Sequence, residues 1–234
     1  MYIPKHFEET RTEVLHRLIH EYPLATLVTQ SATGLAANHI PLHLSPDPAP
    51  LRSLRGYIAR ANPLYTEGVP DGEVLAIFQG PDAYITPSWY ATKQEHGKVV
   101  PTWNYAVVHA HATLRFMEEP EWILSHLHGL TAHNEQSFAE PWTVSDAPEE
   151  YVGKLVRAIV GIELTITRIV GKWKVSQNQP PANQAGVVDG LRQLAVHNAG
   201  PMADLVAQKV KPTSILCGDV PSSGGSLRLG NPAD

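Results

Sequence analysis

Hydrophobic and polar residues alternate along several short segments of this 234-residue chain, and a period of two is typical of half-buried β-strands. The turn-forming sequence Ser31-Ala-Thr-Gly34 separates the first two segments and predicts a hairpin. The longest segment carries His109 and His111 on one face and small apolar residues on the other. The predicted strands cover residues 24–30, 35–44, 54–59, 74–79, 83–86, 102–117 and 160–170.

Proline and glycine mark the connections between the middle strands, because these residues favour turns and interrupt strand pairing. We expect one proline-rich loop and three turns. They lie at Pro46, Pro48 and Pro50, and at Asn62-Pro63, Pro70-Asp71-Gly72 and Gly80-Pro81-Asp82.

Apolar residues spaced three and four apart predict helices around these strands. We expect helices over 8–22, 120–136, 149–158 and 183–209, the last broken at Asn198-Ala-Gly-Pro201. Short strands without a strand–helix–strand rhythm predict an α+β fold, built on an antiparallel split β-barrel with peripheral helices. We expect one domain over residues 1–211, followed by a Gly/Ser/Pro-rich tail, 212–234, that packs poorly.

The charge balance limits the partners that the protein can bind. Lys and Arg number 18 against 23 Asp and Glu, which gives a net charge of −5, and no basic run occurs. Binding that depends on neutralising phosphates needs such a run, so the sequence argues against direct DNA binding. Charged residues make up 18% of the chain, below the roughly 25% of an average soluble domain, which indicates a neutral or partly covered surface.

Cysteine use and hydropathy predict the compartment. The single cysteine, Cys217, cannot form a disulfide within the chain, which fits a reducing compartment. No apolar run reaches about 18 residues, and the sequence Met1-Tyr-Ile-Pro-Lys5 contains no apolar signal region. We therefore expect a cytoplasmic protein without a membrane segment.

Familiar nucleotide and zinc motifs do not occur in the sequence. His109 and His111 are the best case for a metal, since a strand aims both rings to one side, but no Cys, Asp or Glu is spaced to assist them. We expect ordinary strand histidines and no bound metal. Residues 185–208 suggest a helix-turn-helix, yet Arg192 and Lys209 are its only basic residues, which favours a helical hairpin packed on the barrel.

Three segments differ from ordinary core or surface sequence. Asn38-His-Ile-Pro41 places polar groups and a proline in mid-strand, and Ala59-Arg-Ala-Asn62 ends another strand with a guanidinium and an amide. Residues 80–105 crowd prolines, tryptophans and tyrosines into what we expect to be a loop-rich stretch. Such residues form suitable walls for a flat aromatic ligand, and the planar fork of Arg60 suits a phosphate on that ligand. Donors in Gly171-Lys-Trp-Lys-Val-Ser-Gln-Asn178 form a further candidate cluster.

In their order along the chain, these segments resemble the PaiB family of FMN-binding negative transcriptional regulators. The resemblance extends from residue 1 to about residue 210. Tyr57 departs from it, because family members often have histidine there, and Asn183-Gln-Ala-Gly186 replaces a more charged stretch. The shared motifs are Met1-Tyr-Ile-Pro-Lys-His-Phe7, Asn38-His-Ile-Pro41, Ala59-Arg-Ala-Asn-Pro63, Gly80-Pro81, Tyr84-Ile-Thr-Pro-Ser-Trp-Tyr90, Val100-Pro-Thr-Trp-Asn-Tyr105, His109 and Gly171-Lys-Trp-Lys-Val-Ser-Gln-Asn178.

The resemblance implies a split β-barrel of the pyridoxamine-phosphate-oxidase type, a homodimer, and FMN held at the subunit interface. It places the strand edge Asn38–Pro41 along the isoalloxazine ring, with Arg60 and Asn62 at the ribityl and phosphate groups. The other contacts close the pocket, partly from the partner chain. The predicted cofactor-binding residues are Asn38, His39, Ile40, Pro41, Ala59, Arg60, Asn62, Ser88, Trp89, Tyr90, Thr102, Trp103, Asn104, Lys174 and Gln177.

Three functions stay open at the level of the sequence. The first is a homodimeric FMN-binding regulator of the PaiB type that acts through flavin redox state or a protein partner. The second is a flavin-dependent oxidoreductase, or a split-barrel haem oxygenase, since one fold hosts different chemistries; His39 is then a candidate acid or base. The third is a dimeric module that has lost FMN.

Overall fold

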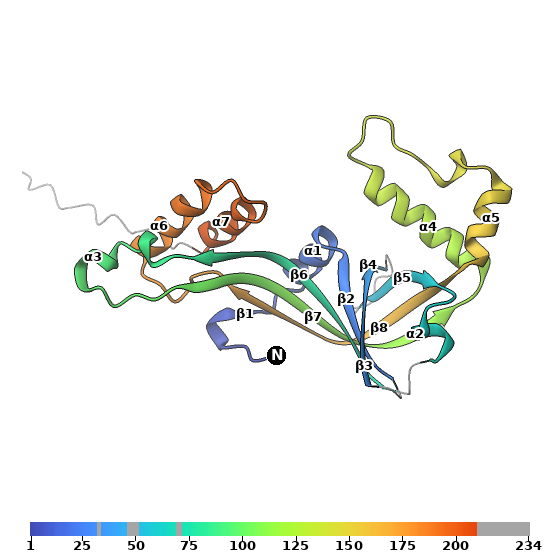
Figure 1. The fold of residues 1–234 in the computed structure, drawn as a ribbon, viewed down its shortest axis with the longest axis horizontal. Helices are drawn as coiled ribbons and strands as arrows, with labels where there is room; N and C mark the ends of the chain where they lie inside the picture. Colours follow the sequence, from blue (N-terminus) through green and yellow to red (C-terminus); the bar gives the residue numbers. More distant parts are fainter. Residues whose placement is uncertain (32–33, 46–51, 69–71, 210–234) are drawn as a thin grey trace, which may run out of the picture.

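The strands form one antiparallel sheet in the order β3-β2-β6-β7-β8-β5-β4, and β1 pairs with β8 (Figure 1). The computed structural model describes residues 1–31, 34–45, 52–68 and 72–209. The expected proline-rich loop, Pro70 and Asp71 of the next predicted turn, Cys217 and the tail 212–234 lie outside the described residues. The strands are β1 (Glu8–Glu9), β2 (Leu24–Ser31), β3 (Gly34–Pro41), β4 (His43–Leu44), β5 (Ser53–Ala59), β6 (Val74–Ile85), β7 (Thr102–Met117) and β8 (Ile159–Lys174).

A single residue, Leu42, closes the sheet into a barrel. Up to Pro41 the chain pairs with β2, and from His43 onward it pairs with β5 at the opposite edge of the sheet. Leu42 is fully buried at the crossing, where its amide donates to the carbonyl of Pro23. Gly56 of β5 permits this approach, since a Cβ there would lie 2.8 Å from the Pro41 carbonyl oxygen. The antiparallel split-barrel fold predicted from the sequence is therefore confirmed.

The three longest strands, β6, β7 and β8, extend beyond the barrel as an arm (Figure 1). The turn predicted at Gly80-Pro81-Asp82 is wrong, because β6 continues through it to Ile85 with a bulge between Gln79 and Asp82. Pairing with β7 on both sides of the bulge outweighs the local turn signal, and a bulge accommodates the missing amide hydrogen of proline. Residues 80–82, expected to form a turn, are therefore part of β6, whereas residues 86–101 connect β6 to β7 without a strand.

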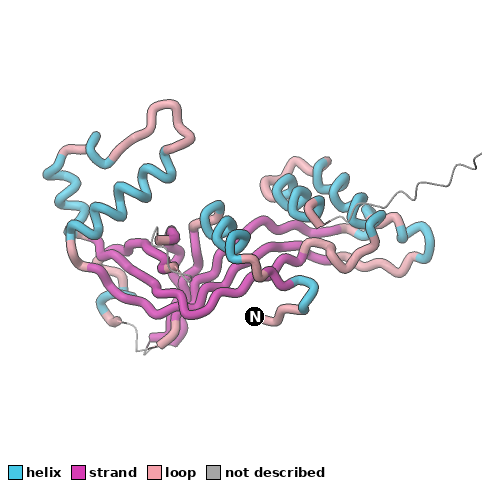
Figure 2. The backbone as a smooth tube through the Cα atoms, turned by 180° about the vertical axis from the view of Figure 1, so that it is seen from behind, coloured by secondary structure: helices cyan, strands magenta, loops and turns pink. Residues whose placement is uncertain are grey.

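Helices α1, α4, α6 and α7 appear on the same side of the sheet in both views of the molecule (Figures 1 and 2). None of the helices within the described residues has the length and apolar character needed to cross a membrane. The α-helices are α1 (Thr12–Glu21), α2 (Pro63–Thr66), α3 (Thr92–His96), α4 (Pro120–Glu135), α5 (Glu149–Arg157), α6 (Pro181–Arg192) and α7 (Ala199–Ala207). Short 3-10 turns are η1 (Lys5–Phe7), η2 (Pro87–Trp89) and η3 (Val144–Asp146).

The predicted break in the C-terminal helical region is misplaced. Helix α6 ends at Arg192, and Gly200 and Pro201 lie in the first turn of α7. A proline is tolerated there because the first amides of a helix have no partner within the helix. Helices α6 and α7 pack on each other and on the arm, as expected for a helical hairpin.

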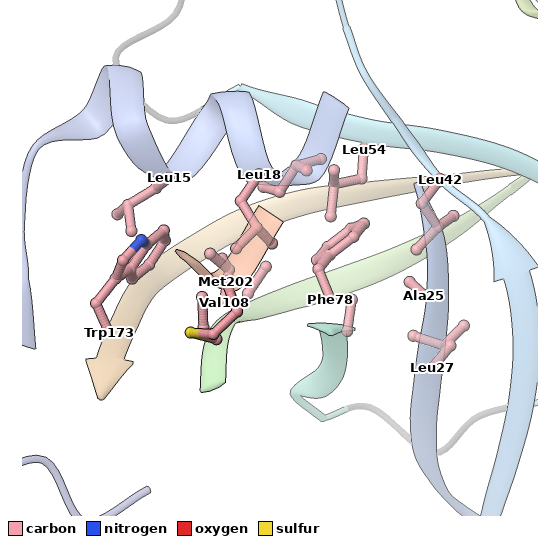
Figure 3. Close-up of a cluster of buried hydrophobic side chains, with 14 of the residues drawn as sticks. Leu15, Leu18, Ala25, Leu27, Leu42, Leu54, Phe78, Val108, Trp173 and Met202 are labelled. Atoms are coloured by element: carbon pink, nitrogen blue, oxygen red, sulfur yellow. The ribbon is translucent and has the colours of Figure 1, made fainter. Parts of the chain in front are cut away.

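Buried side chains connect the barrel to the arm through α1 (Figure 3). Leu42, Leu54 and Phe78 are fully buried around the barrel, while Leu18 of α1 packs in the same cluster. Toward the arm, Trp173 extends this cluster (Figure 3). Burial of each such side chain contributes roughly 1.5–3 kcal/mol, so the core fixes α1 and the arm relative to the barrel.

Candidate functional site

Two asparagines join strand β3 to helix α2. The Asn62 side chain accepts a hydrogen bond from the amide of Leu64 at 2.9 Å and so caps α2, whose first residue is Pro63. Its amide nitrogen also donates to Oδ1 of Asn38 at 3.0 Å. The cap of α2 therefore fixes Asn62 in contact with Asn38, which lies 24 positions earlier in the sequence.

Arg60 lies beside these asparagines, one residue after β5 ends at Ala59. Its Nη1 donates to the Tyr65 hydroxyl at 3.1 Å and to Glu118 at 3.2 Å, and the guanidinium lies 5.4 Å from the centre of the Tyr65 ring. The hydrogen bond from Tyr65, followed by that from Arg60, lowers the pKa of Glu118. Among the described residues, Nε and Nη2 of Arg60 have no hydrogen-bond partner, so the guanidinium can still receive an oxyanion.

Strand β3 lies at an edge of the sheet, with β2 on one side. His39 and Pro41 are exposed on it, Asn38 is half-buried, and Ile40 points into the core with 4% exposure. An edge strand presents backbone amides and carbonyls to a ligand or a second chain. We name Asn38, Arg60, Asn62 and this edge of β3 the barrel cluster.

A second group of polar and aromatic residues lies on the arm. Lys174 donates to the hydroxyl of Thr102 and, at 2.8 Å, to the carbonyl of Trp103. Burial lowers the pKa of Lys174. Trp103 is 55% exposed and meets the half-exposed Tyr84 edge-on at 6.0 Å between ring centres. We name Tyr84, Thr102, Trp103 and Lys174 the arm cluster.

Other predicted site residues near the arm pack or form hydrogen bonds within the protomer. The indole of Trp89 lies on Gly190 of α6, where a Cβ would come within 2.3 Å of it. Tyr90 is 3% exposed, and burial raises its pKa. Asn104 is buried and donates to Ser176 at 2.9 Å. These contacts fix the end of the arm, and a contact between these side chains and a cofactor stays a prediction.

Two further predicted residues also lie at the arm. Gln177 accepts from the amide of Val175 at 2.7 Å and donates to the carbonyl of Trp173, which holds the chain after β8. Ser88 is exposed in η2, 3.4 Å from the amine of Lys93. The contact of either side chain with a cofactor likewise stays a prediction.

The barrel cluster and the arm cluster lie far apart within one chain. Figure 1 shows α2, next to Arg60, at one end of the sheet and α3, between β6 and β7, at the other. Sequence order gave no sign of this separation, and it also gave no sign of Tyr65 and Glu118 as partners of Arg60. These two carry no motif, and only the fold brings Glu118 to the end of β5.

The strand histidines considered as metal ligands have other contacts. Nδ1 of His111 lies 2.8 Å from Glu73, and its Nε2 lies 2.9 Å from Arg168. Burial lowers the pKa of His109. Within the described ranges, no group of three or more His, Cys, Asp or Glu side chains is arranged to hold a metal ion.

Residues 1–168 match the protein family described as "Putative FMN-binding domain". The chain belongs to this family. It is 33% identical over 247 residues to an uncharacterized protein, AN0679, of Emericella nidulans, covering 89% of this chain and 97% of that protein. It is 29% identical over 211 residues to the protease synthase and sporulation protein PAI 2 of Bacillus subtilis, covering 90% of this chain and 99% of that protein. The predicted resemblance to the PaiB family is thereby confirmed.

A solved structure shows the same fold at low sequence identity. The FAD and haem binding protein from Mycobacterium smegmatis superimposes with a TM-score of 0.52 at 16% identity, over 71% of this chain and 73% of that one. At this identity the likeness supports the split-barrel architecture alone.

Family membership makes FMN the cofactor of this chain, as the sequence predicted. The barrel cluster has the donor set that FMN needs. The edge of β3 offers amides and carbonyls to the polar rim of a flavin ring, the Asn38–Asn62 pair offers amide groups to hydroxyls, and Arg60 offers two unused donor positions to a phosphate. The carboxylate of Glu118 would compete with that phosphate, but it is 59% exposed and can turn away.

Proposed function

We propose that the protein is a homodimeric FMN-binding protein of the PaiB type. In this proposal, each FMN lies between the barrel cluster of one protomer and the arm cluster of its partner. Two equivalent sites then form across a two-fold axis, the symmetry of most homodimers. The proposal treats residues 1–211 as one cytoplasmic domain that acts as a regulator.

The separation of the two clusters is the observation that carries this proposal. The motifs by which the sequence resembles the PaiB family occur at both ends of the sheet, and one chain cannot bring them to one small ligand (Figure 1). A partner related by a two-fold axis can, because it reverses the direction of the arm. Large apolar side chains are exposed at both places: Leu24 and Leu35 on β2 and β3, and Trp103 and Val100 at the arm. Exposed apolar groups of this kind favour an interface.

Each part of the proposed site has a separate task. The β3 edge would hold the isoalloxazine ring, Arg60 would hold the phosphate, and the partner's Trp103 would help to close the site. Bound FMN supplies one- and two-electron redox chemistry. The side chains of this chain position the flavin and limit its contact with water.

Regulation through the flavin, rather than through direct DNA contact, fits the charge of the chain. The net charge of −5 disfavours nonspecific attraction to DNA phosphates. The proposed regulator therefore responds through the redox state of FMN, transmitted to a protein partner. A sequence-specific gel shift that persists near physiological salt would contradict this part of the proposal.

The first experiment is to purify the full chain, record its absorption spectrum and measure its mass in solution. We expect flavin absorption, FMN as the released chromophore and the mass of a dimer. A screen with NADH and NADPH then measures whether either reduces the bound flavin. A monomer that binds FMN would contradict the shared site, and a colourless protein that cannot be reconstituted would contradict FMN binding.

A further inference from the structure

A cavity of about 690 Å³ lies between α1, the β4–β5 region and α4, away from both clusters described above. Its volume is in the range of small-molecule sites. Figure 1 shows these elements around the barrel, with α4 above β4 and β5. The lining residues are His16, Arg17, His20, His43, Leu44, Ser45, Arg52, Arg55, Trp122, Ser125, His126, Gly129, Leu130 and His133.

The lining is strongly basic in a chain with a net negative charge. It includes three arginines and five histidines, and no Asp or Glu among the described residues. Arg55 is engaged by Glu163 at 2.9 Å. Arg17 and Arg52, in contrast, have no ion-pair partner in the part of the chain that the structure describes. Two cationic groups without a carboxylate among the described lining residues favour an anionic occupant.

The histidines form a close cluster from three different elements. The ring of His133 lies 4.3 Å from that of His20 and 5.2 Å from that of His43, measured between centres. His126 stacks on Trp122 at 5.6 Å. The Nε2 atoms of His43 and His126 are buried and have no hydrogen-bond partner among the residues that the structure describes. A buried polar atom without a partner is destabilising, and a ligand atom that reaches it removes that cost.

The rings of His43 and His126 are held in the neutral state when the cavity contains no anion. Burial, together with the neighbouring basic groups, lowers the pKa of His43 to about 4 and that of His126 to about 4. Burial also lowers the pKa of His16 and His133. The charged and titratable groups facing them are Arg17 and His20 of α1 and Arg52 and Arg55 next to β4.

We propose that this cavity binds a small organic oxyanion, a carboxylate- or phosphate-bearing metabolite, through Arg17 and Arg52 and the unpartnered imidazole nitrogens of His43 and His126. The volume exceeds that of a bare phosphate, which favours an organic compound. An oxyanion next to an imidazole stabilises the protonated ring. Binding therefore raises the pKa of these rings and takes up protons, and the affinity rises as the pH falls toward the pKa of the rings in the complex.

The test uses the FMN-loaded full-length protein with inorganic phosphate and citrate as probes. Imidazole NMR signals and calorimetry in two buffers of different ionisation enthalpy measure binding and proton uptake. We expect one or both probes to shift the signals of His43, His126 and His133 but not that of His109 on β7, with net proton uptake. The tighter probe identifies the phosphate or carboxylate class.

Variants separate this site from the FMN site. Arg52→Gln is expected to weaken probe binding roughly tenfold or more, because it removes a charge-assisted contact, while Arg192→Gln on α6 leaves it unchanged. Arg60→Ala should lower FMN affinity without affecting the probe. The proposal is overturned if neither probe shifts the signals of the cavity histidines or if Arg52→Gln has no effect on probe binding.

Discussion

The barrel cluster and the arm differ in how they use their polar side chains. At the arm, Asn104 and Gln177 make their hydrogen bonds within the protomer, and Trp89 is packed on α6. At the barrel, Arg60 has donors without a partner in the described part of the chain, and most residues of the β3 edge are exposed. The difference teaches that motifs of one family carry two kinds of residue. Some hold the arm in place, and others are available to a ligand, so substitutions in the two regions should have different effects.

The largest effect is expected from Gly186→Ala, which loosens the arm. A Cβ at this position would lie 2.0 Å from the backbone carbonyl oxygen of Trp89, so α6 and η2 must separate. We expect the free energy of unfolding to fall by about 3 kcal/mol, as for severe overpacking. Urea unfolding monitored by tryptophan fluorescence measures it.

Gly129→Ala is the matched control, since nothing lies within 4 Å of a Cβ at this position in α4. Removing a helical glycine should leave stability unchanged or raise it by up to about 1 kcal/mol. Equal destabilisation of both variants would show that the contact between Trp89 and Gly186 is not what holds the arm.

Arg60→Ala tests the barrel cluster as the phosphate clamp. We expect FMN binding to weaken by about 1–3 kcal/mol, roughly fivefold to 150-fold, with little change in the free energy of unfolding. Titration of the apoprotein with FMN, followed by quenching of flavin fluorescence, gives the dissociation constant.

Glu118→Gln should have the opposite effect on FMN affinity, because Glu118 is the ion-pair partner of Arg60. It removes the carboxylate that lies 3.2 Å from Arg60, so FMN should bind several-fold more tightly, within about 1 kcal/mol. An unchanged dissociation constant in both variants would place the phosphate away from Arg60.

Acid should destabilise the protein in two separate pH ranges, one set by the cavity histidines near the barrel and one set by Glu9 near the arm. The unfolded chain protonates His43 and His126 near pH 6.5, whereas the folded chain protonates them near 4. The unfolded state thus binds more protons in this window, and stability falls from about pH 6.5 to 4 by about 1–3 kcal/mol, allowing for partial exposure. Urea unfolding at several pH values measures the loss, which His43→Gln should reduce.

Glu9, next to the arm on β1, titrates lower. Its hydrogen bond with Arg11 lowers its pKa from 4.5 to about 2, so its stabilising contribution is present above pH 4.5 and is lost as the pH falls toward 2. Glu9→Gln should therefore lower the free energy of unfolding by a constant amount above pH 4.5, abolish the loss that Glu9 causes below pH 4.5, and leave the slope between pH 6.5 and 4.5 as in the wild type. If His43→Gln and Glu9→Gln change the loss of stability over the same pH range, the two groups do not titrate separately.

The smallest effect is expected from Asn62→Ala, which removes the cap of α2 and the bond to Asn38. We expect a loss of about 1 kcal/mol of stability. Asn62→Ser should recover the cap, because serine also accepts from the Leu64 amide, but it is too short to reach Asn38. If Asn62→Ser restores stability but not FMN affinity, the asparagine pair acts on the ligand. Unfolding curves and FMN titrations of both variants decide this.

Local periodicity predicted the elements well where tertiary contacts agree with it. The strand over 102–117 was predicted with its observed bounds, since its alternation matches pairing with β6 and β8 on both sides. The turn at Gly80-Pro81-Asp82 was wrong because long-range pairing outweighed local turn propensity. The helix break at Gly200-Pro201 was wrong because proline is allowed in a first helical turn.

The candidate site was only partly predictable. Residue types made Arg60 and Asn62 candidates, and their role stays a prediction, but the distance between the barrel and arm clusters depends on how far β6 and β7 extend. The histidine cavity gave no sequence signal, since His20, His43 and His133 come from three elements far apart in the chain. Spacing rules apply within an element and cannot detect such a group.

The central claim is that FMN binds between the barrel cluster of one protomer and the arm cluster of the other. Mixed dimers of Arg60→Ala and Trp103→Ala chains test it most directly. Each variant dimer alone has two impaired sites, whereas a mixed dimer has one intact site and one doubly impaired site. FMN titration should therefore show one site per mixed dimer with wild-type affinity. Two sites that both stay impaired would contradict the shared-site account.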